Sequence, residues 1–153
     1  MRNILYSLMV LAALFSCKNE NSTELATDSG DQINADISKA KVIIYYFHGD
    51  RRCASCIAIS DETNNFLVSN YKTECDEGKI VYKDVNIDEE ENNALAEKYE
   101  IAGSALLIIK NNNNSDDEIS DLTGDGFKFA LNKPEVFTEK LKNAIDKYLN
   151  LYK

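Results

Sequence analysis

The sequence is poor in the residues that build common metal and cofactor sites. Of its 153 residues, one is histidine and four are cysteine. Cys53 and Cys56 form a CxxC pair, but no second CxxC and no histidine pair accompany them to complete the four ligands of a closed zinc site. The chain also lacks the Gly-rich strand-to-helix turn that binds flavin or nicotinamide. We therefore expect no bound cofactor and no structural zinc site within one chain.

Positive charge is scarce as well. The 17 Lys and Arg residues are outnumbered by 26 Asp and Glu residues, and the formal net charge is −9. Such an anionic chain has no electrostatic means of binding nucleic acid or anionic lipid head groups. Apolar residues make up 44% of the sequence, enough to fill a core, and the length suits one domain.

A long apolar run of the kind that spans a membrane is missing from the N-terminus, although a shorter one is present. Residues 4–15 are almost wholly apolar and follow Arg2, but they fall short of the roughly 20 residues of a spanning helix. The run ends in residues 14–17 (LFSC), which resemble a bacterial lipoprotein signal. The pattern predicts a signal peptide over residues 1–16 and lipidation of Cys17. The alternatives are an ordinary secretory signal with an incidental cysteine, or a buried N-terminal helix.

Residues 17–38 carry no apolar periodicity and are rich in Asn, Ser, Thr, Glu and Asp. This composition predicts a solvated tether between a membrane and the folded domain, residues 39–153. The expected location is the cell envelope, on the periplasmic or surface side of a bacterial membrane, reached through the lipid on Cys17. Disulfides persist in such a compartment, so the CxxC pair can be oxidised there or held reduced by a dedicated system.

The folded part alternates between strand-like and helix-like segments. The order predicts a single α/β domain of the form β-α-β-α-β-β-α, with parallel strands joined by helical crossovers. Apolar residues recur at helical spacing from the CxxC pair to Asn70, acids at residues 88–91 open a second helix, and Pro134 opens the last one. The predicted strands are residues 41–47 (KVIIYYF), 80–87 (IVYKDVNI), 105–109 (ALLII) and 118–122 (EISDL).

The CxxC pair is thus expected where a strand turns into a helix. The unpaired N–H groups of a first helical turn stabilise a thiolate, and Arg51 and Arg52 add positive charge just before Cys53. Cys53 is then suited to attack a disulfide, and Cys56, one turn further, to resolve the mixed disulfide. The alternative for the two arginines is a solvated loop. Cys75, after a polar segment, is interpreted as incidental.

The residues between 42 and 122, together with the closing helix, resemble thioredoxins. The best-matching segments are residues 86–88 (NID), 99–103 (YEIAG) and 106–109 (LLII). Residues 45–49 (YYFHG), 51–56 (RRCASC), 105–108 (ALLI) and 132–135 (NKPE) are similar to a smaller group, the ArsF-like nitrophenyl-compound nitroreductase subunit family. The resemblance implies a thioredoxin-like fold with a central mixed sheet, and a subunit that works with a redox partner protein.

The departures from thioredoxin concern the groove opposite the pair. Arg52 stands at the position of the tryptophan before the first cysteine, and Ala105 at the position of the cis-proline. A cis bond before a non-proline residue costs about 2.5–4 kcal/mol, so a trans peptide and a reshaped groove are expected. The resemblance implies that Arg52, Ser104 and Ala105 contact substrate.

Two further residues are candidates for catalysis. Tyr46 aligns with the buried acid of thioredoxin's first strand, and Asp84 with the lysine that pairs with that acid. The acid has therefore changed strands, and Asp84 is a candidate to take the proton from Cys56; the alternative is a surface carboxylate. His48, at the end of the first strand, is a candidate to hold the thiolate or to lend a metal ligand, or it is simply a polar residue at a strand end.

Three functions remain open from the sequence. The first is a membrane-anchored thiol–disulfide oxidoreductase or dithiol electron-relay subunit that uses a redox-active disulfide between Cys53 and Cys56. The second is a metal- or metalloid-binding protein in which the thiolates of the same pair are soft ligands. The third is a non-catalytic interaction module in which the pair is a structural disulfide.

Overall fold

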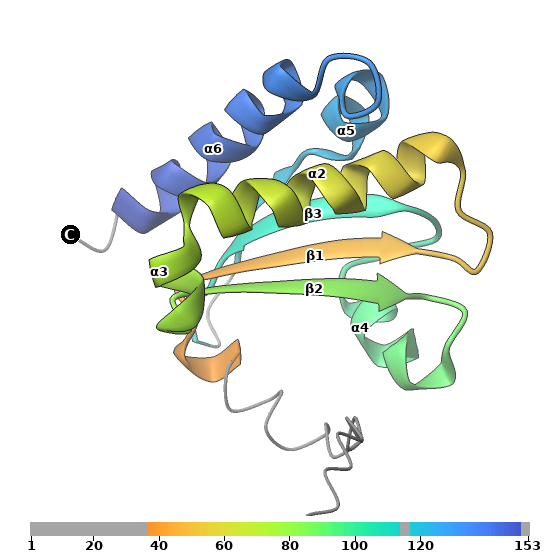
Figure 1. Cartoon of the computed structure of the whole chain (residues 1–153). Helices are drawn as coiled ribbons and strands as arrows, with labels where there is room; N and C mark the ends of the chain where they lie inside the picture. The colour runs from red at the N-terminus through yellow and green to blue at the C-terminus, as the bar shows by residue number, and fades with distance from the viewer. Residues whose placement is uncertain (1–36, 114–116, 151–153) are drawn as a thin grey trace, which may run out of the picture.

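Four strands form one sheet in the order β2-β1-β3-β4 (Figure 1). The computed structural model describes residues 37–113 and 117–150; the predicted signal peptide, Cys17 and nearly all of the predicted tether lie outside them. β1 (Val42–His48) pairs in parallel with β2 (Ile80–Asn86) and antiparallel with β3 (Ala105–Lys110). β4 (Glu118–Asp121) is antiparallel to β3. The sheet is therefore mixed, as expected.

Helices connect the strands in the predicted order. α2 (Ala54–Asn70) and the short α3 (Lys72–Asp76) supply the crossover that the parallel pair β1 and β2 requires. A 3-10 turn (Glu90–Asn92) and α4 (Asn93–Lys98) lead from β2 to β3, and α5 (Thr123–Phe129) and α6 (Pro134–Asn150) follow β4. This topology is a thioredoxin-like α/β fold, which confirms the predicted fold class.

β1 lies inside the sheet and is buried on both faces, which explains its nearly continuous apolar sequence. Its side chains alternate between two cores, because successive residues of a strand point to opposite faces. Val42, Ile44 and Tyr46 pack in the larger core, with residues of α2 and α6. Ile43, Tyr45 and Phe47 pack in the smaller one, with Leu95 and Tyr99 from the α4 region. The two cores fix β1, and its C-terminal end carries the site described below.

Two short helices, α3 and α5, were not predicted, and the acids at residues 88–91 do not open an α-helix directly. Asp88 and Glu89 precede the 3-10 turn, and α4 begins only at Asn93. α5 contains Gly124 and Gly126, which weaken its helical pattern. A Cβ on Gly126 would lie 3.0 Å from two carbons of Ile59 in α2, so the missing side chain lets α5 approach α2 closely.

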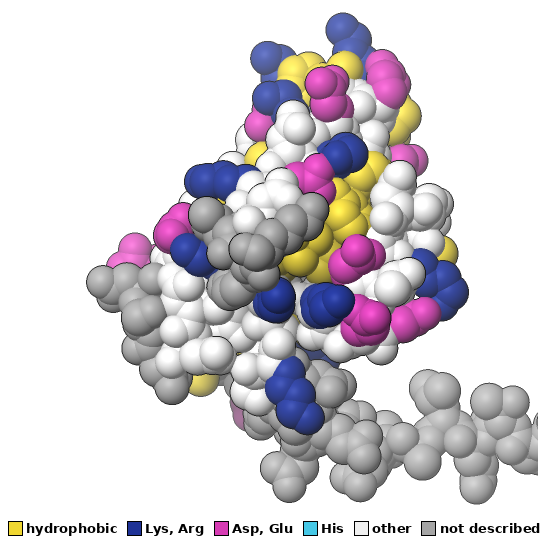
Figure 2. Space-filling model, turned by 90° about the vertical axis from the view of Figure 1, so that its left-hand side faces the viewer, with side chains coloured by type: hydrophobic (Ala, Val, Ile, Leu, Met, Phe, Trp, Pro, Cys, Tyr) yellow, Lys and Arg dark blue, Asp and Glu magenta, His cyan; other side chains and the backbone are white. Residues whose placement is uncertain are grey.

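The end of the molecule opposite the β1–α2 turn is formed by α3 and the C-terminus of α6; it carries an apolar strip between charged side chains of both signs (Figure 2). Cys75 lies in α3, half-buried against the larger core, and burial and the neighbouring Glu74 raise the pKa of its thiol. The 17 residues of α2, about 25 Å of helix, separate this end from Cys53. No helix within the described residues is long and apolar enough to cross a membrane.

Candidate functional site

The CxxC pair lies at the start of α2, directly after the loop that follows β1. Cys53 is the N-cap residue, with extended backbone, and its Sγ accepts a hydrogen bond from the backbone N–H of Cys56 at 3.3 Å. Its carbonyl accepts the N–H of Ile57 at 3.0 Å, the first hydrogen bond of the helix. The predicted position of the pair is thus confirmed: the first sulfur replaces the side-chain oxygen of an ordinary N-cap.

The two thiols differ in exposure and touch each other. Both cysteines are free; Cys53 is exposed, whereas Cys56 is 6% exposed. Their Sγ atoms lie 2.7 Å apart. Burial raises the pKa of the Cys56 thiol, but hydrogen bonds with Cys53 and Ser104 outweigh burial and leave that pKa below its ordinary value. The two sulfurs are thus joined by one hydrogen bond.

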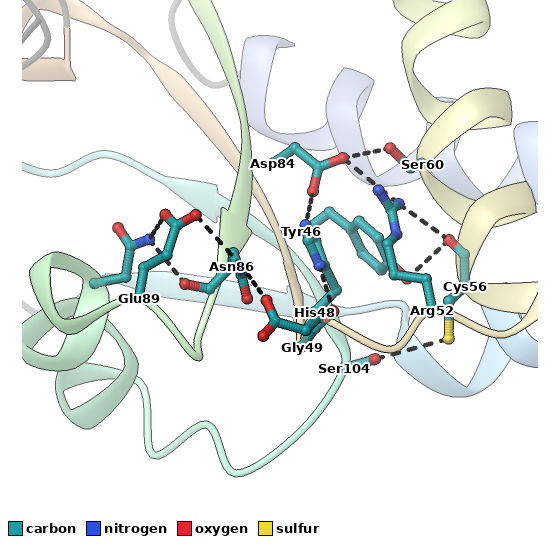
Figure 3. A network of polar contacts seen from close by, with 12 residues as sticks. Tyr46, His48, Gly49, Arg52, Cys56, Ser60, Asp84, Asn86, Glu89 and Ser104 are labelled. Atoms are coloured by element: carbon teal, nitrogen blue, oxygen red, sulfur yellow. Dashed lines mark hydrogen bonds and ion pairs between the residues drawn. The ribbon is translucent and has the colours of Figure 1, made fainter.

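The backbone carbonyl of Cys56 is anchored by two side chains (Figure 3). The buried hydroxyl of Tyr46 donates a 2.8 Å hydrogen bond to it, and the guanidinium of Arg52 reaches it at 3.4 Å. Burial raises the pKa of Tyr46, so this hydroxyl keeps its proton throughout the physiological range. Tyr46 therefore acts as a hydrogen-bond donor beneath the first turn of α2.

Asp84 lies next to Tyr46, because the parallel register of β1 and β2 pairs these two residues. Its Oδ1 lies 2.6 Å from His48 Nε2, and its Oδ2 lies 2.5 Å from Ser60 Oγ and 3.6 Å from the Arg52 guanidinium. The carboxylate is thus surrounded by three donors, with 31% of its side chain exposed. The structure thus brings Asp84, His48 and Arg52 together, and proton transfer from Cys56 to Asp84 stays a prediction.

Ser60 is a further residue of the site that was not predicted from the sequence. It lies one helical turn after Cys56, on the same side of α2, and its Oγ also lies 3.3 Å from the hydroxyl of Tyr82. The four-residue spacing between Cys56 and Ser60 was the one sequence feature that could have indicated Ser60. This spacing has a meaning only once the pairing of β2 with β1 is known, because that pairing places Asp84 below this face of α2.

His48 uses both nitrogens of its ring. Nδ1 lies 2.9 Å from the carbonyl of Gly49, and Nε2 faces Asp84. Both partners are hydrogen-bond acceptors, and the two contacts fix the direction of the ring. Within the described residues, no group of three or more His, Cys, Asp and Glu side chains could hold a metal ion. The His48 ring faces Asp84 and not the two sulfurs in the contacts described. A direct role for His48 at the thiols, or as a metal ligand, stays a prediction.

Ser104 and Ala105, predicted to contact substrate, lie on opposite sides of the start of β3. Ser104 Oγ lies 3.9 Å from Cys56 Sγ, so this hydroxyl reaches the pair. Ala105 is 9% exposed, pairs with Phe47 and packs in the smaller core. The structure brings Ser104 to the thiols and directs the methyl group of Ala105 into the core; contact of either residue with substrate stays a prediction.

A second polar network holds the loop between β1 and Cys53. The N–H of Asp50 donates to Asp88 Oδ2 at 2.7 Å, and the side-chain amide of Asn86 donates to Asp50 Oδ1 at 2.8 Å. Gly49 allows this close approach, since a Cβ there would lie 2.9 Å from Asp88 Oδ2. Both networks lie at the C-terminal ends of β1 and β2 (Figure 3). Together they fix the loop that presents Arg52 and Cys53.

Comparisons with known proteins add little to this picture. No protein-family model and no curated protein sequence matches the chain. Among solved structures, a malarial protein is 20% identical over 71% of this chain and 98% of its own, with a TM-score of 0.42. A mutant thioredoxin from Halobacterium salinarum is 16% identical over 78% and 85% of the two chains (TM-score 0.48), and chloroplastic thioredoxin z is 19% identical over 70% and 90% (TM-score 0.42).

All three TM-scores lie below 0.5, so the assignment of the fold rests on the strand order, the strand directions and the connections of this chain. By these features the protein has a thioredoxin-like fold, with two free thiols in contact at the start of its first long helix.

Proposed function

We propose that the protein is a thiol–disulfide oxidoreductase or a dithiol electron-relay subunit, with Cys53 as the nucleophile and Cys56 as the resolving thiol. The observation that carries this proposal is the asymmetry of the pair. Cys53 is an exposed helix N-cap, and Cys56 is buried with its sulfur 2.7 Å from that of Cys53. An incoming disulfide can reach only the first thiol, and the second is placed to attack the bond that the first one forms.

The reaction needs no cofactor. The Cys53 thiolate attacks one sulfur of the partner's disulfide, that S–S bond breaks, and a mixed disulfide and a partner thiolate result. The Cys56 thiolate then attacks Cys53 Sγ and releases the second partner thiolate. The partner gains two electrons and two protons and becomes a dithiol, while Cys53 and Cys56 lose two electrons and become a disulfide. The reverse sequence oxidises a partner dithiol.

The proposal extends to the location and the partner of the protein. Residues 1–17 support export and lipid anchoring on Cys17, and residues 18–38 a tether to the membrane surface. The working partner is then another protein of the cell envelope. Membership of the ArsF-like nitrophenyl-compound nitroreductase subunit family is supported by the segments around the CxxC pair and Pro134, and would make that partner a reductase subunit.

Trapping of the mixed disulfide tests the proposed reaction. The Cys56→Ser variant cannot resolve the intermediate, so incubation with a disulfide-containing protein should give a covalent adduct that a reducing agent releases. Cys53→Ser should give none, and Cys75→Ser, which removes a thiol of raised pKa at the far end of α2, should react like the unmodified protein. Absence of any adduct with Cys56→Ser would falsify the proposed function.

A further inference from the structure

Arg52 precedes the nucleophilic thiol in sequence, yet its side chain turns inward. Its guanidinium reaches the carbonyl of Cys56 at 3.4 Å, lies 3.6 Å from Asp84 Oδ2 and sits over the ring of Tyr46, with Cζ 5.4 Å from the ring centroid. Its Nε is buried and has no hydrogen-bond partner among the residues that the structure describes. Burial of an N–H without a partner costs free energy, so the contacts of the guanidinium must stabilise the inward direction of the side chain.

Asp84 is the anion among these contacts, and both of its oxygens are engaged. His48 binds Oδ1, and Ser60 binds Oδ2 at the same time as Arg52 approaches it. A carboxylate fixed by a histidine and a serine is a rigid counter-charge. Its attraction for the guanidinium fixes the direction in which the flexible side chain of Arg52 points.

The guanidinium is held against the first turn of α2. The first turn of α2 already presents its N–H groups to Cys53 Sγ. The guanidinium of Arg52 reaches the backbone carbonyl of Cys56, the residue that carries the second sulfur, at 3.4 Å. A cation held near a thiol favours the thiolate and, with it, the reduced form of the pair.

We propose that Arg52 is the positioning cation of the dithiol and that Asp84 acts on the thiols through Arg52, by holding its guanidinium against the first turn of α2. Asp84 is thus a positioning residue, and direct proton transfer from Cys56 to Asp84 is the competing role. The inference rests on the proposed function for the identity of Cys53 as the reactive thiol.

The pH dependence of alkylation tests the proposal. The reduced full-length protein is treated with iodoacetamide, and the modification of Cys53 is localised by fragment-ion mass spectrometry. Arg52→Gln should raise the midpoint pH of the alkylation rate by roughly half a unit to one unit, because the fixed cation is lost. The same change in an Asp84→Asn background should shift the midpoint by less than about half as much, because the guanidinium is no longer held there.

Arg51→Gln is the matched control. It removes the same charge one residue earlier, from an exposed side chain, and should shift the midpoint far less than Arg52→Gln. If Arg52→Gln proves unfolded by circular dichroism, Arg52→Lys replaces it. Lysine keeps the charge without the planar fork, so its shift should be smaller and should again fall by more than about half with Asp84→Asn.

Three results would overturn the proposal: no shift with the Arg52 variant, an equal shift with and without Asp84, or an equal shift with Arg51→Gln. The second of these is the result expected if Asp84 serves Cys56 directly as a base. Alkylation needs no disulfide substrate, so a failure here is distinguishable from a failure to trap the mixed disulfide.

Discussion

Ser104 Oγ lies 3.9 Å from Cys56 Sγ, so a hydroxyl from the loop before β3 reaches a sulfur at the start of α2 across 48 residues of sequence. Burial raises the pKa of the Cys56 thiol, and this contact is one of the hydrogen bonds that lower it. The Cys56 thiol therefore depends on a residue from a distant part of the chain, which sequence spacing alone does not bring near it.

Replacement of Ser104 by alanine should raise the pKa of the Cys56 thiol, because a donor to the thiolate is lost. The thiol is titrated in the Cys53→Ser variant, with the ¹³Cβ shift of Cys56 as the readout. Ser104→Thr keeps a hydroxyl at this position and should leave the titration nearly unchanged. Equal shifts for the alanine and threonine variants would show that the hydroxyl has no part in the effect.

Tyr46→Phe should lower the free energy of unfolding by about 1–2 kcal/mol, since a buried carbonyl loses its 2.8 Å hydrogen bond while the ring remains. Urea denaturation measures the difference. Tyr82→Phe is the matched control: its hydroxyl is only partly buried and lies 3.3 Å from Ser60 Oγ, so the expected loss is about 0.5 kcal/mol or less. A Tyr46 variant as stable as the control would contradict the anchoring role.

Replacement of Glu100 by glycine should stabilise the protein. It follows α4 with φ 55°, and the hydrogen bonds Glu100 N–H to Glu97 O (3.1 Å) and Ile101 N–H to Ala96 O (2.8 Å) form a Schellman motif. The left-handed residue of this motif is usually glycine, because a Cβ there costs about 1 kcal/mol.

Glu100→Gly is therefore expected to raise the free energy of unfolding by about 1 kcal/mol, measured by urea denaturation at constant pH. Glu97→Gly, an exposed position inside the same helix, should lower it by a similar amount. Destabilisation by both substitutions would argue against the left-handed conformation of residue 100.

The two glycines of α5 should respond with opposite signs to alanine. A Cβ on Gly124 meets no atom within 4 Å, whereas one on Gly126 would lie 3.0 Å from two carbons of the fully buried Ile59. Gly124→Ala should raise the thermal midpoint through helix propensity, worth about 0.5–1 kcal/mol. Gly126→Ala should lower it, because overpacking typically costs about 1–3 kcal/mol and outweighs that gain. Calorimetry measures the thermal midpoints of the two variants. If both midpoints change in the same direction, the close approach of α5 to α2 is contradicted.

The long elements could be predicted because their patterns are local. The apolar run of β1 and the stripe Phe137, Leu141, Ala144, Ile145 and Tyr148 of α6 are visible in the sequence and are buried in the structure. α5 was missed because its reason for being helical lies in α2: Gly126 has no helical preference of its own, and it packs against Ile59. Likewise, the acids after β2 could not reveal that a 3-10 turn precedes α4.

At the site, the CxxC pair and its place at a helix start could be predicted from the sequence, because they follow from spacing and from strand and helix patterns. His48 was a candidate from its place at the end of the first strand, and Asp84 from the resemblance to thioredoxins. Which groups meet depends on the tertiary fold. The parallel register of β1 and β2 places Asp84 beside Tyr46, and α2 lies over both, so Ser60, His48 and Arg52 converge on one carboxylate. The loop before β3 brings Ser104 to Cys56. The physical reason is that a hydrogen bond depends on a few tenths of an ångström between side chains from separate elements, and packing, not local sequence, sets those distances.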